Sequence, residues 1–583
     1  MGKDSDSFHK NAVRACDDLM KQPQHIQNVV ENYTSKQIAD NRLRVKTSIE
    51  AVQWLAFQGC AFRGHDESVD SINPGNFVKL LELLASYNEK VAEDILQNAP
   101  RNASYTSPKI QKQMLQAFSV RVKKAIREEI DNSKFCIIVD EVHDESKKEQ
   151  MAIVLRFVDK DGFIREPFFG LVHVSDTKAS TLQKAIYSVL SNHNLDIQNI
   201  RGQGHDGASN MGGEWNGLQA LILKDCPYAY YVHCLAHRLQ LALVAASREV
   251  IPIQKFFTKL TFIVNILGAS CKRNDEFQSA QVEEIAYLTS IDELETGRGL
   301  NQIGTLQCTR DTRWSSHFKS ISSLRQRFSL TCQVLLNIIE EGKRPQAGDA
   351  DLAYESMTLY QFVFIFMEEI MENTNELCLA LQSQSQDILN AMSLVSSTKT
   401  FIQKLRDDGW DTLFAKVNSF CEARNIDIPD MNARYVGRGG RARHQQDDWT
   451  IQHYYQVDIF YAVIDSQLQE LSNRFNEHAV ELLTLSSALD PIEISKCFKI
   501  DAICQLVEKF YPHDFADHEK LQLKKHLEFF EYDVVKDQEF KSISTISDLS
   551  QWLVRTKRST RYPLVYRVIV LVITLPVSTA TTE

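Results

Sequence analysis

RGQGHDGASNMGGEWNGLQALILKDCPYAYYVHCLAHR occupies residues 201–238 of the chain. The sequence predicts an extended segment over Ile197–Gly204, which delivers the acidic Asp206 into a turn of small residues, and a short helix after the pair Gly212 and Gly213. A carboxylate just past a strand end, on small-residue backbone, suits a site for a hard metal ion, because the oxygens must approach one ion closely. One carboxylate does not make a site, so others must come from elsewhere in the chain.

Upstream of this stretch, short apolar runs predict three meandering strands. They are Phe135–Val139, which ends on Asp140, then Met151–Val158, and then Phe163–Val174, with a hairpin turn at Asp159–Gly162 between the second and the third. A helix over Thr181–Leu190 precedes the fourth strand, Ile197–Gly204. This order of strands and helices is typical of the opening of a ribonuclease-H-like fold.

In that fold the first and fourth strands lie side by side, about 4.8 Å apart, so acids at their matching ends can share a pair of metal ions. Asp140 and Asp206 are the candidates. Two alternatives stay open from the residues alone. Glu141 or Asp144 could be the true ligand on the first strand, and Asp206 could simply make a side-chain-to-backbone turn.

A second extended run, Ala229–Val232, leads into His233, Cys234 and His237. Cysteine and histidine at this spacing can bind zinc, but only three such groups occur here and no partner pair is in view. Cys234 and His237 lie on successive turns of one helix face, which favours packing or hydrogen bonding near the acids. We therefore predict no zinc site.

Length, composition and charge limit the class of protein, its partners and its compartment. A chain of 583 residues with 43% hydrophobic and 24% charged residues is typical of a globular protein of two to four domains. The net charge of −11 argues against a wholly basic nucleic-acid coat, although a local basic groove is compatible with it. The 12 cysteines are scattered and the N-terminus is polar, which predicts a reducing compartment, and the apolar run Val568–Leu575 is too short for a membrane span.

The predicted fold class is α/β plus α, with four regions. They are a helical N-terminal region (1–130), a ribonuclease-H-like core (131–250), a helical insertion (251–545) and a C-terminal segment (546–583) that returns to the core. Apolar residues at helical spacing, such as Ile388, Val395 and Ile402, predict the core of a helix bundle. A Gly/Arg loop at Arg434–Arg443 interrupts the helices, and it either follows nucleic-acid phosphates or is a flexible, soluble surface.

Four pieces of the sequence together resemble the hAT transposase superfamily: Asp140 on a first strand, the GHDGASNM turn at Asp206, the CLAH element at Cys234, and Thr312–Ser316, which reads TRWSS. FCIIVDEVHDESKKEQMAIVLRFVD and the closing YPLVYRVIVLVITLPVSTATTE are similar to the subgroup of zinc finger MYM-type-like and TTF-type transposase relatives. The resemblance covers nearly the whole chain.

The resemblance implies a ribonuclease-H-like domain split by a large helical insertion, with a dimerisation segment at its C-terminal end. It assigns the three metal-binding and catalytic acids to Asp140, Asp206 and Glu583, which would hold two Mg²⁺ (or Mn²⁺) ions for DNA cleavage and strand transfer. Cys234 and His237 would support the active site, and Arg313 with Trp314 would contact DNA, although Trp314 could simply cap a helix in the core. The arginines of the Gly/Arg loop complete the predicted DNA contacts, namely Arg438, Arg441 and Arg443.

The chain also departs from that family. The usual N-terminal zinc-binding finger is missing, and the sequence stops at Glu583, where a helix should begin. We therefore expect a C-terminally truncated hAT derivative in the nucleus whose ancestral DNA-cleaving activity is degenerate. The alternatives are a domesticated, non-catalytic protein that binds DNA or protein partners, and a fragmentary gene model. DNA is the expected partner, homodimers or higher homo-oligomers are expected from the family, and no membrane contact is expected.

Overall fold

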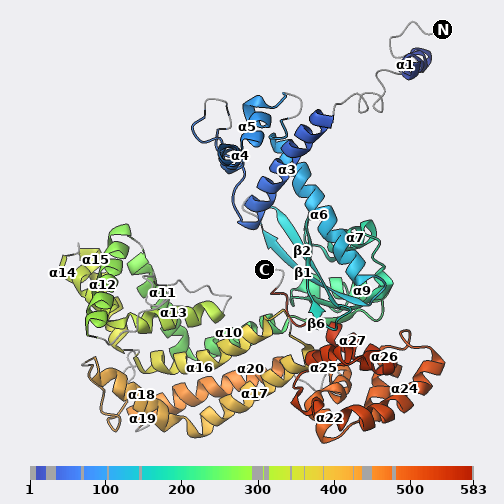
Figure 1. Ribbon diagram of the computed structural model, residues 1–583. Helices are drawn as coiled ribbons and strands as arrows, with labels where there is room; N and C mark the ends of the chain where they lie inside the picture. Colours follow the sequence, from blue (N-terminus) through green and yellow to red (C-terminus); the bar gives the residue numbers. More distant parts are fainter. Residues whose placement is uncertain are drawn as a thin grey trace. The chain divides into compact units, whose positions relative to one another are not determined.

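The computed structural model describes residues 8–20, 35–66, 68, 71–100, 104–143, 147–268, 270–291, 306, 314–341, 344–359, 361–384, 386–424, 426–435, 449–475 and 481–580 (Figure 1). The chain divides into two compact units, Met1–Ala125 and Ile126–Glu583. The division falls inside helix α6 (Pro108–Ile130), close to the boundary at residue 130 that the sequence suggests.

The first unit is helical, as its apolar periodicity predicts. Val52 and Leu55 on one helix and Phe77 and Leu81 on the next form its buried core. Asn88 starts the following helix by accepting a hydrogen bond from the backbone N–H of Val91, which satisfies one of the donors that a helix start leaves open. Its elements are α1 (Phe8–Met20), α3 (Ser35–Phe57), α4 (Asn76–Tyr87), α5 (Glu89–Asp94), η2 (Leu96–Asn98) and the first part of α6.

The second unit contains one mixed sheet in the order β3-β2-β1-β5-β6, with β4 also paired to β2. β1 is antiparallel to β2 and parallel to β5, and β5 is parallel to β6. The order of elements in the sequence predicts this arrangement, because the predicted first and fourth strands correspond to β1 and β5, which lie side by side. The elements are β1 (Phe135–His143), β2 (Glu149–Val158), β3 (Ile164–Arg165), β4 (Phe168–His173), α7 (Ala179–Asn192), η3 (Ile197–Asn199), β5 (Ile200–His205), α8 (Ser209–Gly212), α9 (Leu218–Asp225) and β6 (Tyr230–His233).

Three strand boundaries differ from the sequence-based prediction. The third extended segment is split into β3 and β4, because Pro167 lies between them and has no N–H to donate to the ladder. The fourth strand starts at Ile200, since Asp196 caps a 3-10 turn over Ile197–Asn199. The first strand does not end at Asp140 but runs on to His143, because β2 continues to pair with it.

The two faces of the sheet have different coverings. Phe135, Ile137 and Val139 pack in one core with residues of α7 and α9. The residues between them, Cys136 and Ile138, face the C-terminal segment of the chain, whose Pro576 lies over β5. The sheet is therefore covered on one face by helices close to it in sequence, and on the other by the C-terminal segment, which is remote from it in sequence.

A large helical region follows the sheet. In it α10 packs against α20 and α16, α17 packs against the same two helices (Figure 1), and the buried faces of these helices share one hydrophobic core with α27. The elements are α10 (Leu235–Glu249), α11 (Ile251–Gly268), α12 (Cys271–Ser290), α13 (Trp314–Gln326), α14 (Phe328–Glu341), α15 (Arg344–Leu359), α16 (Gln361–Leu381), α17 (Ile388–Asp408), α18 (Trp410–Glu422), α19 (Ile451–His453), η4 (Tyr454–Tyr461), α20 (Ala462–Arg474), α21 (Glu481–Ser486), η6 (Ser487–Leu489), α22 (Pro491–Lys496), α23 (Ile500–Phe510), α24 (Asp517–Phe530), η7 (Glu531–Val535), η8 (Phe540–Ser542), α25 (Ile546–Arg555), α26 (Arg558–Arg561) and α27 (Pro563–Thr574).

Over the described residues, no single helix has both the length and the apolar character needed to cross a membrane. The consecutive helices α10 and α11 meet that requirement only when taken together, and they are bent by 106° at their junction.

Two buried arginines join the sheet to the helical region. Arg156 on β2 is fully buried, donates hydrogen bonds of 2.9 Å to the carbonyl of Ile573 and 2.7 Å to the carbonyl of Gln386, and pairs with the carboxylate of Glu166. Arg201 on β5 makes two 2.6 Å hydrogen bonds to the two carboxylate oxygens of Asp514. Because the fork of a guanidinium fits a carboxylate or several carbonyls at once, each arginine fixes the relative position of distant parts of the chain.

We predict that Arg156→Ala lowers the free energy of unfolding by about 3–5 kcal/mol, because it leaves the Glu166 carboxylate, 5% exposed, without its buried partner. Urea unfolding followed by circular dichroism measures the change. The control is Arg406→Ala, which breaks the more exposed pair with Asp465 and should leave the free energy of unfolding nearly unchanged, because solvent screens that pair. An equal, small loss in both variants would contradict the role given to Arg156.

Candidate metal and nucleic-acid site

The candidate site lies at the end of the β1–β5 pair, where the two strands stop pairing. Their parallel register pairs Ile138 with Gly204, and two residues further along each chain stand Asp140 and Asp206. Side chains alternate along a strand, so Asp140 lies on the same face as Ile138, the face turned toward the C-terminal segment. The two aspartates thus stand equally far beyond the last paired residues of β1 and β5, Asp140 within β1 and Asp206 just after β5.

Each aspartate is half-buried and has a defined backbone setting. Asp140 stays paired with Ala152 of β2 on one side, and its Oδ1 accepts a hydrogen bond of 3.0 Å from the N–H of Glu141. Asp206 follows the end of β5, and its Oδ1 accepts a 3.2 Å hydrogen bond from the N–H of Ala208. The turn-making role considered for Asp206 is therefore present in the structure, together with its place beside Asp140.

A cavity of about 240 Å³ lies in front of the two aspartates. Five parts of the chain contribute to it: the end of β1, the turn after β5, the start of α10, the residue after α16 and the C-terminal segment. Its lining residues are Asp140, Glu141, Asp206, Cys234, Ala236, His237, Gln240, Gln382, Ser578, Thr579 and Ala580. The sequence predicts Asp140, Asp206, Cys234 and His237 for this region, and all four line the cavity.

Cys234 joins the C-terminal segment to the start of α10. It is the N-cap of this helix, and its sulfur accepts hydrogen bonds from the N–H of His237 (3.4 Å) and from the N–H and hydroxyl of Thr579 (3.2 and 3.4 Å). The N–H of Leu235 donates to the carbonyl of Val577 at 2.9 Å. In the described structure the cysteine therefore caps α10 and contacts the C-terminal segment, close to the acids.

Steric constraints explain why the GHDG motif has glycine at positions 204 and 207. A Cβ on Gly204 would lie 2.8 Å from Cβ of Pro576, and a Cβ on Gly207 would lie 2.4 Å from the Cε1 atom of His233. Contacts under 3.0 Å are not tolerated without movement, so both positions exclude side chains. Because Gly204 has no side chain, the C-terminal segment can approach the sheet. Because Gly207 has none, the turn after Asp206 can pack on β6.

On the other face of β5 and β6 lies an aromatic ladder that the sequence analysis missed. The ring of His205 stacks on Tyr231, with centroids 4.4 Å apart, and the ring of His233 follows at 6.4 Å from Tyr231. Burial lowers the pKa of His205 to about 4, and burial with the positive charge of Arg238 lowers the pKa of His233 to about 3. Both imidazoles are neutral at pH 7 and add no positive charge behind the aspartates. The available signal was the spacing of Tyr231 and His233, two positions apart in β6, because residues two apart in a strand share a face.

Other lining residues lacked a signal in the sequence. Gln240 lies one turn beyond His237 on α10, and Gln382 comes from the end of α16 in the helical insertion. Glu141, weighed as an alternative ligand, also lines the cavity, and its two carboxylate oxygens lie 3.4 and 3.3 Å from the side-chain nitrogen of Asn210. Gln382, Ser578 and Thr579 reach the site only through the tertiary fold, so local patterns could not indicate them.

Several predicted site residues lie outside the described part of the chain. They are Arg313, Arg438, Arg441, Arg443 and Glu583, together with the alternative ligand Asp144. Trp314 is the first residue of α13, but its side chain is also outside the described part. Ala580, three positions before Glu583, lines the cavity. The roles of these residues remain predictions.

The donor set of the cavity suits a hard cation. Two aspartates, Glu141, the amides of Gln240 and Gln382 and the hydroxyls of the C-terminal segment all offer oxygen. Within the described residues, no group of three or more histidine, cysteine, aspartate or glutamate side chains could hold a metal ion by itself. Magnesium in proteins is usually held by one or two carboxylates and completes its shell with water and substrate phosphates, so the residues present fit Mg²⁺ or Mn²⁺.

Comparisons with known proteins agree with the ribonuclease-like architecture. Residues 1–217 match the family described as DUF4371, "ZMYM1/FAM200, RNase-like domain". The chain is 22% identical over 473 residues to the Mus musculus protein named "52 kDa repressor of the inhibitor of the protein kinase", covering 78% of this chain and 60% of the relative. The Homo sapiens protein of the same name is 21% identical over 474 residues, covering 78% of this chain and 59% of the relative.

The chain therefore spans about three fifths of the length of these curated relatives. The family match ends at residue 217, soon after the turn that carries Asp206, and so includes both aspartates. Together the matches support the assignment of the sheet to an RNase-like domain, and they are consistent with the transposase-derived family that the sequence resembles.

We predict that Gly204→Ala lowers the free energy of unfolding by about 1–3 kcal/mol, because the new methyl group would overlap Pro576 and push the C-terminal segment off the sheet. The matched control is Gly348→Ala within α15, where nothing lies within 4 Å of the new Cβ, so the change should be neutral or stabilise by up to about 1 kcal/mol. Thermal and urea unfolding of both variants measure the difference. Equal stability of the two variants would contradict the close packing of Pro576 on β5.

Proposed function

We propose that this protein is a hAT-type transposase derivative that acts on DNA through the cavity at the junction of β1 and β5. Its ancestral reaction is metal-dependent DNA cleavage followed by strand transfer. The observation that carries the proposal is the placement of Asp140 and Asp206 equally far beyond the last paired residues of β1 and β5, both lining one cavity. Paired carboxylates in this arrangement on a ribonuclease-H-like sheet serve reactions at phosphodiester bonds.

Asp140 and Asp206 would hold the metal, with Glu141 as a further oxygen donor at the same edge. When bound, Mg²⁺ or Mn²⁺ supplies Lewis-acid activation of a water or a 3′-hydroxyl and charge stabilisation at the phosphate. The protein's own residues supply position. The Asx-type hydrogen bond to Ala208 and the pairing of Asp140 with Ala152 hold the two carboxylates on rigid backbone, as a precise metal site requires.

A second candidate function is DNA or protein binding without cleavage. Two observations favour it. The cavity is also lined by Ser578 and Thr579, whose hydroxyls contact the sulfur of Cys234. The curated relatives carry the name of a repressor, and a repressor needs partners but no nuclease. We propose that the present chain has a degenerate catalytic centre and binds DNA in the nucleus, as a homodimer or higher homo-oligomer.

The metal proposal predicts that Mn²⁺ binds the purified protein and that Asp206→Asn or Asp140→Asn weakens this binding by about tenfold or more, equivalent to at least about 1.4 kcal/mol. The readout is the free Mn²⁺ signal in electron paramagnetic resonance, which does not depend on catalysis. Glu214→Gln is the matched control, because Glu214 is exposed in the loop after α8 and does not line the cavity, so it should leave the affinity unchanged.

A cleavage assay on the same proteins separates the two candidate functions. Nicking or end cleavage of a duplex DNA substrate that needs Mn²⁺ and is lost in Asp206→Asn supports a working nuclease. Binding of that DNA without nicking, unaffected by the same variant, supports the non-catalytic function. Absence of both Mn²⁺ binding and DNA binding would contradict the proposal as a whole.

A further inference from the structure

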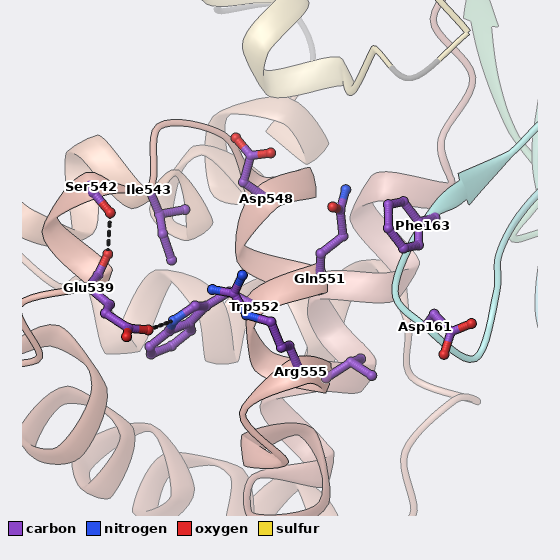
Figure 2. Close-up of a pocket in the computed structure, with 10 residues that line it drawn as sticks. Asp161, Phe163, Glu539, Ser542, Ile543, Asp548, Gln551, Trp552 and Arg555 are labelled. Atoms are coloured by element: carbon purple, nitrogen blue, oxygen red, sulfur yellow. Dashed lines mark hydrogen bonds between the residues drawn. The ribbon is translucent and has the colours of Figure 1, made fainter.

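A second cavity, of about 580 Å³, lies away from the aspartates, beside the hairpin that joins β2 to β3. Asp161 and Phe163 of the hairpin form one wall, and Glu539 with Ile543 forms the opposite one. Figure 2 shows α25 running between these walls, with Asp548 and Gln551 among the labelled side chains. The volume is in the range of about 300–1,000 Å³ that ligand-binding clefts occupy.

One face of α25 forms the floor. Asp548, Gln551, Trp552 and Arg555 all line the cavity and are spaced three or four residues apart, so they lie along one side of the helix. Trp552 is buried, whereas the ring of Phe163 is 43% exposed. The floor and walls thus combine aromatic and aliphatic surface with charged groups at the edge.

The hairpin wall is fixed in place before any ligand binds. The hydroxyl of Ser550 on α25 donates a 3.0 Å hydrogen bond to the carbonyl of Gly162. Gly162 has φ +86°, and a Cβ there would lie 2.9 Å from the carbonyl oxygen of Ser550, so the turn packs directly on the helix. Asp159 closes the turn by accepting hydrogen bonds of 2.9 Å from the N–H groups of Asp161 and Phe163.

The opposite wall is held by a side-chain contact. The indole N–H of Trp552 donates a 2.8 Å hydrogen bond to a carboxylate oxygen of Glu539, and the ring of Trp552 packs edge-on against Phe540. The segment before α25 cannot move toward the hairpin without breaking these contacts. Walls fixed in this way reduce the entropy lost when a ligand is ordered between them.

The charges around the cavity are mostly negative. Three carboxylates, those of Asp161, Glu539 and Asp548, line it, against the guanidinium of Arg555. Two more guanidinium groups lie at its aromatic rings, that of Arg165 5.4 Å from the ring of Phe163 and that of Arg558 4.4 Å from the ring of Trp552, and each is paired with a carboxylate outside the lining, Asp159 and Asp537. Such a lining repels nucleic-acid phosphates and attracts ammonium or guanidinium groups. The exposed ring of Phe163 can additionally contact an apolar side chain or the alkyl stem of a lysine or arginine.

We propose that this cavity binds a short segment of a partner protein in which a lysine or arginine stands next to an apolar side chain. The cationic group would lie between the carboxylates of the two walls, and the apolar group would pack on Phe163 and Ile543. This cavity shares no lining residue with the aspartate site, so the proposal does not depend on the metal and DNA chemistry proposed above.

The test uses the full chain and three fluorescein-labelled probes of equal length: a peptide of Leu-Lys-Ser repeats, the same peptide with glutamate in place of lysine, and single-stranded oligothymidylate. Fluorescence anisotropy gives each dissociation constant at low and high salt. We expect saturable binding of the lysine peptide, at least about tenfold tighter than that of the glutamate peptide, and weakened by salt.

Substitution of Gln551, which is partly exposed on the α25 face, makes the test specific. Gln551→Lys should weaken binding of the lysine peptide about tenfold, because it adds a positive charge to the cavity. Gln551→Glu should strengthen this binding about threefold, because it adds a negative charge at the same position. Glu508→Lys is the control, since Glu508 is exposed on α23 and does not line the cavity, and it should change the affinity little.

Two outcomes would overturn the proposal. One is equal binding of the lysine and glutamate peptides, or no saturable binding of the lysine peptide. The other is binding of oligothymidylate that Gln551→Lys strengthens and Gln551→Glu weakens, which would make the surface a nucleic-acid site. Because both Gln551 variants keep a long side chain on the helix surface, the circular dichroism of all proteins should be the same.

Discussion

The buried guanidinium of Arg156 is the contact on which the rest of the second unit depends. It extends from β2 on the face of the sheet opposite α7 and α9, and reaches backbone carbonyls of α27 and of the residue before the cap of α17. A guanidinium in such a place must have its donors satisfied, since an unpaired buried charge costs several kcal/mol. The sheet, the helical insertion and the C-terminal helix are therefore held in one arrangement, and Arg201 with Asp514 adds a second connection of the same kind at β5.

The cavity at the aspartates follows from this arrangement. The chain beyond α27 passes over β5 at the two positions, Gly202 and Gly204, where the strand has no side chains, and then binds the sulfur of Cys234. Its next residues line the cavity together with Asp140 and Asp206, and α16 adds Gln382 from the insertion. The site is thus assembled from five parts of the chain, and its shape depends on contacts that contain none of the candidate metal ligands.

Local patterns were sufficient to predict the sheet and the two aspartates. Phe135–Val139 is a continuous apolar run, and a turn of small residues follows Ile200–His205, so strand identity and order could be inferred. Strand ends were less predictable. β1 extends past Asp140 because β2 offers it a partner, which composition does not show. The break of the third strand at Pro167, in contrast, had a signal in the sequence, because proline has no N–H for the ladder.

The contacts that the sequence could not indicate are those between residues far apart in the chain. Arg156 reads as one charged residue in an apolar strand, and neither its burial nor its partner carbonyls, 230 and 417 residues away, leave a local signal. The same holds for Gln382 and Thr579 at the cavity. Cys234 is an intermediate case, because its place before a helix suggested a capping or packing role, whereas its bonds to the C-terminal segment depended on the fold.

The central claim is that Asp140 and Asp206 face each other across the end of the β1–β5 pair. A double-mutant cycle tests it most directly: the free energies of unfolding of the wild type, Asp140→Asn, Asp206→Asn and the double variant, measured by urea denaturation in a chelating buffer. Neighbouring carboxylates repel, so removing one relieves the other, and the double variant should gain less than the sum of the two single changes, by about 0.5–3 kcal/mol. Additivity within about 0.3 kcal/mol would mean that the two side chains do not interact, and would contradict the account.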